Sequence, residues 1–332
     1  MYPKVSIIIT AHERENYLMA ALESIKNQTA DRKLFEVIVA KNFQNIEVDE
    51  YITQNGYINL YCAGSLAYKV SKSLELCNGE IITFLEDDDT YHKDRIKIII
   101  EKFRDFPEIS FYHNSLIEIN ESGEQIRRSH HPQVKKCMVI DSQIIEKHLA
   151  YLVSRNVDFN NGCIALKKNI LLKYLEIYIN STNLSSSFTD ALYFLFSINS
   201  KGLIFIDSDV LTNIRRHDSA SVKLTGDMLH IIEFYQRFNK DFLNVIQYIK
   251  KTMNLNETAN KYITIKESKA ELEKNINSFS SRVFLIYAFK KYVKSIKRPY
   301  GKYEILLSIS FMISLISRNT GKKFLYQILH IA

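Results

Sequence analysis

Four consecutive acids, Glu86 to Asp89, follow a short apolar run in the segment "IITFLEDDDTYHKDR". Adjacent carboxylates repel one another, and each is costly to hold beside a hydrophobic sheet unless water or a cation compensates its charge. Carboxylate oxygens are the ligands that Mg²⁺ and Mn²⁺ prefer, and such an ion can in turn hold a diphosphate. The acids therefore predict either a divalent metal site for a phosphorylated ligand or an ordinary solvated turn.

The chain has no glycine-rich loop that could wrap a phosphate. Neither GxxxxGK[ST] nor GxGxxG occurs in the sequence, so backbone amides in such a loop cannot carry nucleotide binding. A metal bridge from the acids is the main alternative way to bind a nucleotide.

Apolar patterns predict the elements that would position the acids. Continuous apolar runs typical of buried parallel strands occur at Val5–Ile9, Phe35–Ala40, Ile58–Ala63 and Ile81–Leu85. Segments with helical periodicity, such as "ENYLMAALESIKNQ", separate these runs, which predicts βαβ units and a mostly parallel sheet. Ligands bind at the carboxyl ends of the strands in such sheets. The acids lie directly after Leu85, so their position favours a functional site.

The second half of the chain continues with mixed elements. "SFYHNSLIEIN" and "EQIRRSH" read as a hairpin, "GCIALKKN" (Gly162–Asn169) as a strand, and "TDALYFLFSINSKG" as a short buried helix. "LIFIDSDVLTNIRRH" reads as a pair of strands, and the chain from Ser219 to about Ser280 as polar and helical.

Composition and charge exclude some classes of protein. The 332 residues are 46% hydrophobic and 24% charged, which is ordinary for one or two folded domains. The net charge is +7, but Ser281 to Ala332 alone carry ten Lys or Arg against one Glu, or +9, and the remainder 34 − 36 = −2. The basic character belongs to the tail, so a nucleic-acid-binding function for the whole chain is disfavoured.

Cysteine spacing and the N-terminus bear on the compartment. The four cysteines form no CxxC pair, which argues against a structural zinc site and indicates a reducing environment. The N-terminal apolar run is too short for a signal peptide, so we expect a cytoplasmic protein.

Five segments in the same order resemble the GT-A family 2 glycosyltransferases. They are "VSIIITAHERENYLMAALESIKNQT", "FEVIVAKN", "NGEIITFLEDDDTYHKDRI", "SFTDALYFLFSINSKG" and "LTNIRRHDSAS", and they span Val5 to about Val222. The resemblance implies an α/β fold: a Rossmann-like, mostly parallel sheet flanked by helices, with a C-terminal helical extension. It also implies a glycosyltransferase domain at 1–222, divided into a nucleotide-sugar half (1–107) and an acceptor half (108–222), followed by a helical region at 223–332.

The resemblance also assigns roles near the acids. Glu86-Asp87-Asp88 would be the DxD-type motif, with Glu in place of the usual first Asp, and Mg²⁺ or Mn²⁺ would be held by Glu86, Asp88 and His217. Donor-binding positions implied are Thr10, Ala11, His12, Glu13, Asn42, Lys69, Asp87 and Arg215. Asp87 would approach the ribose. A helix N-terminal acid remains the alternative for Asp89, a solvated helix lysine for Lys69 and a structural histidine for His217.

Asp190 matches the family's acidic position at the start of the acceptor-side helix, where a carboxylate deprotonates the incoming hydroxyl. General-base catalysis requires such an acceptor within hydrogen-bond reach of that hydroxyl. The alternative is an N-terminal helix acid stabilised by the helix dipole. A second acid usually precedes this position, and Thr189 replaces it here.

Two departures from the family pattern concern the nucleotide base. The second strand usually ends in an Asp pair, and here those positions are Ala40 and Lys41. Glu13 stands where Asn is common. The base pocket is therefore atypical, with UDP as the default donor nucleotide.

The basic tail has two interpretations. "VFLIYAFKKYVKSIKR" places Leu285, Phe289, Tyr292 and Ile296 on one helical face, and basic residues on the opposite face. "ILLSISFMISLIS" is apolar for 13 residues, short of the ~20 needed to span a bilayer. The tail predicts peripheral binding to an anionic membrane surface, or else a helical pair packed on the core.

Three classes of function follow from these observations. The leading hypothesis is an inverting glycosyltransferase that moves a sugar from a nucleoside-diphosphate sugar to a hydroxyl of a glycan or lipid-linked acceptor. A nucleotidyltransferase would normally show a glycine- and lysine-rich N-terminal loop, which "ITAHERENY" lacks. A non-catalytic sugar-nucleotide-binding module is the third class, because the Asp pair is missing.

Overall fold

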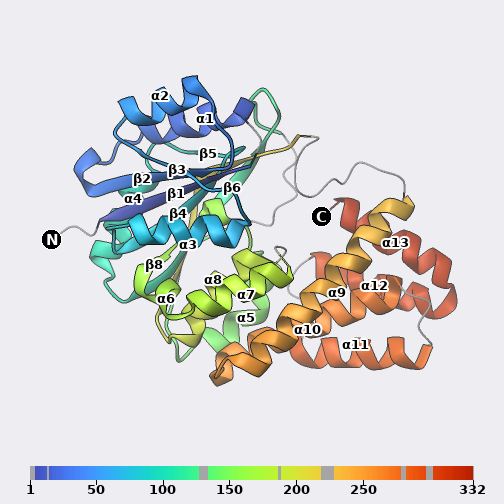
Figure 1. Cartoon of the computed structure of the whole chain (residues 1–332). Coiled ribbons are helices and arrows are strands. Elements are labelled where there is room, and N and C mark those ends of the chain that lie inside the picture. The colour runs from blue at the N-terminus through green and yellow to red at the C-terminus, as the bar shows by residue number, and fades with distance from the viewer. Residues whose placement is uncertain are drawn as a thin grey trace. The chain divides into compact units, whose positions relative to one another are not determined.

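The computed structural model describes residues 4–12, 15–126, 134–185, 188–217, 228–277, 282–296 and 302–331. The chain forms two compact units (Figure 1). The first, the sheet unit, comprises residues 1–129, 133–142 and 158–216, and the second, the helical unit, comprises residues 130–132, 143–157 and 217–332. A helix from the middle of the chain thus belongs to the helical unit. The division at residue 222 into a glycosyltransferase domain and a helical C-terminal region stays a prediction.

All strands of the described residues join one sheet in the sheet unit. In chain order they are β1 (Val5–Ala11), β2 (Phe35–Lys41), β3 (Ile58–Tyr61), β4 (Ile81–Glu86), β5 (Thr90–Tyr91), β6 (Ile109–Ile119), β7 (Met138–Ile140), β8 (Ile164–Lys167) and β9 (Leu203–Arg215). The order across the sheet is β3-β2-β1-β4-β8-β6-β9-β5, with β7 paired to β9. The strands β1 to β4 run parallel, whereas β8 runs antiparallel to both β4 and β6. The predicted mostly parallel sheet with flanking helices is confirmed, and the sheet is mixed because of the antiparallel β8.

Helices cover both faces of this sheet. They are α1 (Glu15–Lys26), α2 (Ile46–Gln54), α3 (Leu66–Leu76), α4 (Arg95–Asp105), α6 (Lys168–Lys173), α7 (Leu175–Leu184) and α8 (Thr189–Asn199), with 3-10 turns η1 (Arg32–Leu34) and η2 (Asn161–Cys163). Figure 1 shows α1 and α2 over one face, and α3, α7 and α8 over the other.

Burial on both faces explains the continuous apolar run of β1. Ile7 and Ile9 join a core cluster with Leu18 and Leu22 of α1 on one side. The neighbouring residue Ile8 points to the opposite face and is equally buried. A strand enclosed on both faces has no polar alternation, which is why the sequence pattern predicted it.

Two expectations for the second half need correction, and a third is only partly described. The segment read as a pair of strands is one strand, β9, whose pairing with β6 shifts register at several points, so that it bends without breaking. The strand expected at Gly162–Asn169 begins only at Ile164 and gives way to α6 at Lys168. The predicted hairpin retains one bridge, Ile119 to Gln125, and most of its second strand falls outside the described residues.

The helical unit contains α5 (Ile145–Ser154), α9 (Met228–Thr252), α10 (Glu257–Asn277), α11 (Arg282–Ile296), α12 (Lys302–Ile316) and α13 (Arg318–Ile331). The inner face of α11, with Leu285, Tyr292 and Ile296, is buried in this unit, where α11 packs on α10. The tail is therefore an integral part of a helical assembly. Among the described residues, no helix is both long and apolar enough to cross a membrane.

Candidate functional site

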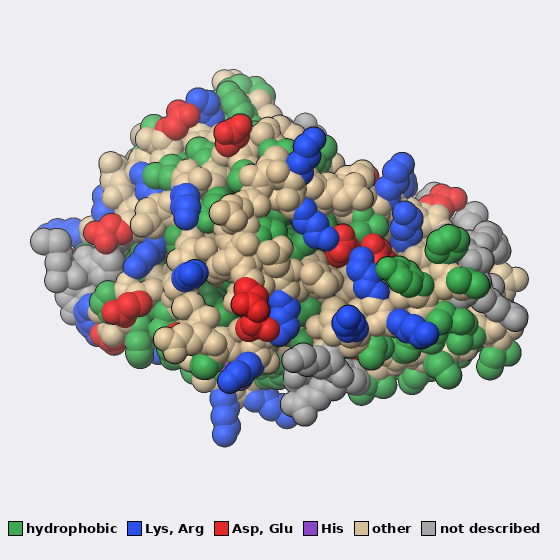
Figure 2. All heavy atoms as spheres, turned by 90° about the horizontal axis from the view of Figure 1, so that it is seen from below, with side chains coloured by type: hydrophobic (Ala, Val, Ile, Leu, Met, Phe, Trp, Pro, Cys, Tyr) green, Lys and Arg blue, Asp and Glu red, His purple; other side chains and the backbone are tan. Residues whose placement is uncertain are grey.

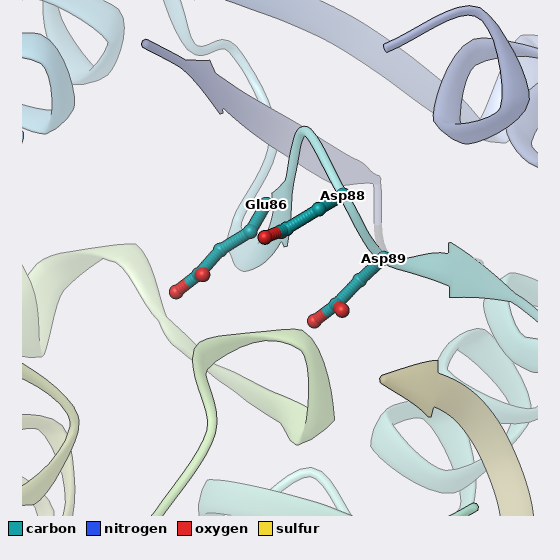
Figure 3. A group of neighbouring side chains, drawn as sticks. All are labelled: Glu86, Asp88 and Asp89. Atoms are coloured by element: carbon teal, nitrogen blue, oxygen red, sulfur yellow. The ribbon is translucent and has the colours of Figure 1, made fainter. Parts of the chain in front are cut away.

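The acids occupy a tight turn at the carboxyl end of β4. Glu86 closes the strand, and the N–H of Asp89 donates to its carbonyl oxygen at 3.3 Å before β5 begins. The side chains of Glu86, Asp88 and Asp89 extend from this turn toward the same side (Figure 3). One carboxylate oxygen of each lies within 4.8 Å of the others. The three acids therefore converge.

These acids do not form a solvated turn. Asp87, Asp88 and Asp89 are buried, and Glu86 is half-buried. Burial, and then the charges of Asp88 and Glu86, raise the pKa of Asp89 well above its ordinary value. Such a group favours its neutral form unless a cation compensates the charge, so the cluster is electrostatically suited to a positive ion.

Two asparagines at the start of η2 border the acids. The Nδ2 of Asn161 donates to Oε1 of Glu86 at 3.2 Å. The side chain of Asn160 lies beside Asp89 and opposes the rise in the pKa of that carboxyl. The Oδ1 atoms of both asparagines are buried without a hydrogen-bond partner. Unpaired buried amide oxygens beside three convergent carboxylates fit a hard divalent cation such as Mg²⁺ or Mn²⁺, whose ligands in proteins are oxygens.

Asp87 faces a different way from its neighbours. It is fully buried, and its Oδ2 accepts the backbone N–H of His12 at 2.8 Å. Thr10 lies opposite Glu86 in the register between β1 and β4. The sheet thus brings the end of β1 and the acid turn together, as the topology of parallel strands requires.

Lys69 is buried in α3, so the solvated alternative for this residue was wrong. Its Nζ donates to the carbonyl oxygen of Ala11 at 2.5 Å. A buried ammonium at the end of β1 places positive charge beside the predicted donor-binding loop. Glu13 of that loop lies outside the described residues.

Arg215 holds the acid turn in place. Its backbone N–H donates to Oδ1 of Asp89, and its Nε to the carbonyl oxygen of Asp88, both at 3.0 Å. Its Nη1 donates to the carbonyl oxygens of Asn120 and Glu121 at 3.0 and 2.7 Å. These bonds join β9 and the turn after β6 to the acids, which makes Arg215 a positioning residue in this structure.

Asp190 lies in the first turn of α8, as the sequence predicted, and is half-buried. Its Oδ2 accepts the backbone N–H of Asn160 at 2.8 Å. A parallel stack between Phe84 of β4 and Tyr193 of α8, with ring centroids 4.5 Å apart, packs this helix against the strand that carries the acids. One residue, Asn160, therefore contacts both Asp190 and Asp89.

Sequence reasoning missed Asn160 and Asn161. Asn160 has φ = 69°, a left-handed conformation that asparagine tolerates better than most residues. The run "DFNNG", Asp158 to Gly162, is a turn signal in the sequence. It could have indicated a sharp loop, although not its position beside the acids.

The remaining predicted site residues are less closely tied to the acids. Asn42 follows β2 and is half-buried. Next to it, the buried Nζ of Lys41 pairs with Oδ1 of Asp49 on α2 at 2.7 Å and donates to the carbonyl oxygen of Phe43 at 2.6 Å. His217 is half-buried, and it does not lie within the cluster of Glu86, Asp88 and Asp89.

Comparison with known proteins agrees with this fold. The family model "Glycosyl transferase family 2" matches residues 6–175. Protein CgeD of Bacillus subtilis is 28% identical over 141 residues, 38% of this chain and 33% of CgeD. An uncharacterised glycosyltransferase of Rickettsia felis is 30% identical over 132 residues, 38% of this chain and 21% of that protein. The match thus spans about a third or less of these relatives.

Solved structures share the fold at low sequence identity. Residues 1–349 of S. aureus TarS superpose with a TM-score of 0.56 at 13% identity, covering 98% of this chain and 90% of that one. The mannosyltransferase PcManGT of Pyrobaculum calidifontis, in complex with GDP-Man and Mn²⁺, gives a TM-score of 0.55 at 11% identity, covering 100% and 86%. These neighbours are GT-A glycosyltransferases. With the family model matching half of its length, this chain belongs to glycosyl transferase family 2.

Proposed function

We propose that this protein is an inverting glycosyltransferase that moves a sugar from a nucleoside-diphosphate sugar to the hydroxyl of an acceptor. The observation that carries the proposal is the position of Asn160, whose backbone N–H donates to Asp190 of α8 and whose side chain lies beside Asp89 of the acid turn. The predicted donor-binding turn and the predicted base are thus connected through one residue. A transfer reaction needs these two groups at a fixed separation, because donor and acceptor must meet in line.

The convergent carboxylates of Glu86, Asp88 and Asp89 would hold Mg²⁺ or Mn²⁺. When bound, the ion supplies positive charge that offsets the charge developing on the departing diphosphate. His217, which the sequence predicted as a metal ligand, would be a further ligand of this ion. Asp87, whose carboxylate accepts the N–H of His12, would help to orient the donor. The donor would lie near the end of β1, beside Thr10, Ala11 and Lys69.

Asp190 would act as the general base. Its carboxylate would accept the proton of the acceptor hydroxyl while the hydroxyl oxygen attacks the anomeric carbon and the bond to the diphosphate breaks. Attack from the face opposite the leaving group inverts the anomeric configuration. The N–H of Asn160 would orient the carboxylate by fixing one of its oxygens.

UDP is the default donor nucleotide in this proposal. TarS has been crystallised with UDP-GlcNAc and with UDP, and PcManGT with GDP-Man, so neighbours of this fold bind either base. The ion pair between Lys41 and Asp49 occupies the end of β2, beside Asn42. Base recognition here would rest on different groups from the usual Asp pair.

The acceptor would be a glycan or a lipid-linked molecule, and the protein would work in the cytoplasm, at the cytoplasmic face of a membrane. The basic tail supports this location, since it carries +9 of charge against −2 for the remainder. Basic residues next to apolar helices are attracted to anionic lipid headgroups.

The test uses the purified full chain with a panel of nucleotide sugars. Release of free nucleoside diphosphate is measured with Mn²⁺, with Mg²⁺ and with EDTA. Metal-dependent release from one or a few donors is the expected result. Saturable binding of a nucleotide sugar without any hydrolysis or transfer would instead identify a non-catalytic binding module.

A further inference from the structure

Helix α12 exposes apolar side chains and buries several polar ones. Its exposed residues are aliphatic or thioether side chains, namely Ile305, Ile309, Met312 and Ile316, with exposed fractions of 50, 41, 58 and 85%. Their spacing of four, three and four residues places them on one helical face. The buried face carries Glu304, Ser310 and Ser314 beside Leu307 and Phe311. A helix that packs in water shows the opposite arrangement, because apolar surface is driven out of contact with water.

The buried side of α12 packs closely on α13 through small residues. A Cβ added at Gly321 would lie 1.9 Å from Oγ and 2.7 Å from Cα of Ser314. The Oγ of Ser310 donates to the carbonyl oxygen of Gly321 at 3.0 Å. Small residues with interhelical hydrogen bonds are typical of helix pairs that associate in lipid, where apolar side chains gain nothing by facing inward.

The adjacent helix α11 extends this surface. Phe289 of α11 stacks on Phe311 of α12 with ring centroids 3.8 Å apart. The outward face of α11 exposes Val283, Phe284 and Tyr287, at 75, 66 and 67%. Sequence analysis expected that face to be basic only, and it is instead mixed, because these residues share it with Lys290 and Lys294.

Figure 2 shows green side chains gathered over part of the helical unit, with Lys and Arg side chains beside them. We define the outer apolar face as Val283, Phe284, Tyr287, Ile305, Ile309, Met312 and Ile316. Monomeric proteins rarely leave such contiguous apolar surface in water.

We propose that the outer apolar face inserts shallowly into the interface of an anionic bilayer, with Lys290 and Lys294 reaching the headgroups. The proposal rests on the membrane location stated above and names the surface that achieves it. Interfacial helices bury an apolar face at the acyl boundary and carry lysines beside it, and lysine stems can extend along apolar surface while the ammonium stays in water. The helices need not span the bilayer.

Charge favours lipid over a second copy of the chain. Among the described residues of α11 to α13, the exposed charged side chains are all lysines, and the acid Glu304 is buried. Pairing the same face in a two-fold dimer would bring these lysines together without compensation. An anionic lipid surface provides the opposite charge.

The test uses full-length protein and flotation with vesicles of phosphatidylcholine alone or with 30 mol% phosphatidylglycerol. We expect binding to the anionic vesicles at low salt. The double variant Ile309→Asp/Met312→Asp should weaken it at least ~10-fold, since it places charge at the acyl boundary. Lys290→Gln and Lys294→Gln should each weaken it about fivefold on anionic vesicles. Leu172→Asp, a comparably exposed apolar residue of α6 at 47%, is the matched control and should bind like the wild type.

Two further measurements separate the outcomes. UDP titration with Mn²⁺ should be unchanged in Ile309→Asp/Met312→Asp, which shows that the fold and the donor site persist independently of membrane binding. Sedimentation velocity reports the oligomeric state. Any of three outcomes would overturn the proposal. The wild-type protein does not bind anionic vesicles at low salt, or the double variant binds them as well as the wild type does. The third is a wild-type dimer that the double variant dissociates, with no vesicle binding by either protein.

Discussion

The two units of this protein bury polar groups in opposite ways. In the sheet unit, carboxylates collect at one strand end, where neighbouring residues such as Arg215 hold them by directed hydrogen bonds. In the helical unit, α12 buries two serines and Glu304 beside Leu307 and Phe311, and it exposes aliphatic residues. The first arrangement concentrates charge for a ligand, and the second offers apolar surface to a partner. The presence of polar side chains alone therefore does not identify a functional site, because it matters equally whether those side chains face the core or the solvent.

The largest expected effect comes from breaking the acid turn. Asp88→Asn removes one of the three convergent carboxylates, so Mn²⁺-dependent UDP binding should fall at least ~10²-fold in calorimetric titration. The fold should persist, and thermal stability without metal should stay equal or rise slightly, because repulsion with Asp89 is relieved. Asp105→Asn, an exposed acid on α4, is the control. Unchanged affinity in the Asp88 variant would remove this residue from the metal site.

The second effect separates binding from chemistry. Asp190→Asn keeps an oxygen that can accept the N–H of Asn160 but removes the basic charge. Donor binding should be spared, while turnover falls at least ~10²-fold, the usual scale for a general base. Steady-state kinetics of nucleotide release would show this as a loss in kcat with little change in KM. A kcat near that of the wild type would mean that another acid is the general base. The buried Asp158, in the loop that carries Asn160, would be the next candidate.

The sequence predicted the first half of the sheet well. Strand β1 is buried on both faces, so its apolar run is unbroken and its end could be located. The acids lie within one turn of the chain, so their convergence needed no long-range information. Asp190 was placed at a helix start by pattern and resemblance, and the structure has it there.

What the sequence could not provide is contact between distant segments. Asn160 lies beside Asp89 although 71 positions separate the two residues in the sequence. The pairing of β8 with β4 brings them together, and no hydrophobic periodicity in the sequence indicates that pairing. Arg95, at the start of α4, is fully buried and donates to Asn114 and Thr83 at 2.9 Å, contacts that a charged residue in the sequence does not reveal. The outward face of α12 was likewise invisible, because an apolar run does not say which side packs inward.

A third effect concerns the amino end of β2, at the opposite ends of the parallel strands from the acids. Burial opposes ionisation of Glu36, but hydrogen bonds from Ser6, Asn78 and Lys4 outweigh it and lower its pKa to about 2. A folded-state pKa below the ordinary 4.5 means that ionised Glu36 stabilises the fold above pH 4.5 and loses this contribution as pH falls toward 2. Because solvent partly screens a carboxylate at this half-buried position, Glu36→Gln should lower the free energy of unfolding at pH 7 by roughly 1–2 kcal/mol.

The pH dependence is what distinguishes this variant. Urea unfolding at pH 7, 4.5 and 3 should show the gap between wild type and Glu36→Gln narrowing as pH falls. Glu47→Gln, an exposed acid on α2, should show no such gap. A gap that stays constant with pH would mean that the hydrogen bonds at Glu36 do not depend on its charge.

The smallest expected effect tests the close packing of α12 on α13. Gly321→Ala introduces a Cβ that would overlap Ser314, and overpacking typically costs about 1–3 kcal/mol. Alanine is also the better helix former by about 1 kcal/mol, so the net loss should be near 1 kcal/mol. Amide hydrogen exchange should show the loss of protection in residues 302–331, with the sheet strands unchanged.

The control is Asn319→Ala, at an exposed position on the same helix. It raises helix propensity without a clash and should be neutral or stabilising. If Gly321→Ala stabilises as much as this control, then the helices are not in close contact, and the lipid-like packing that supports the outer apolar face would lose its basis.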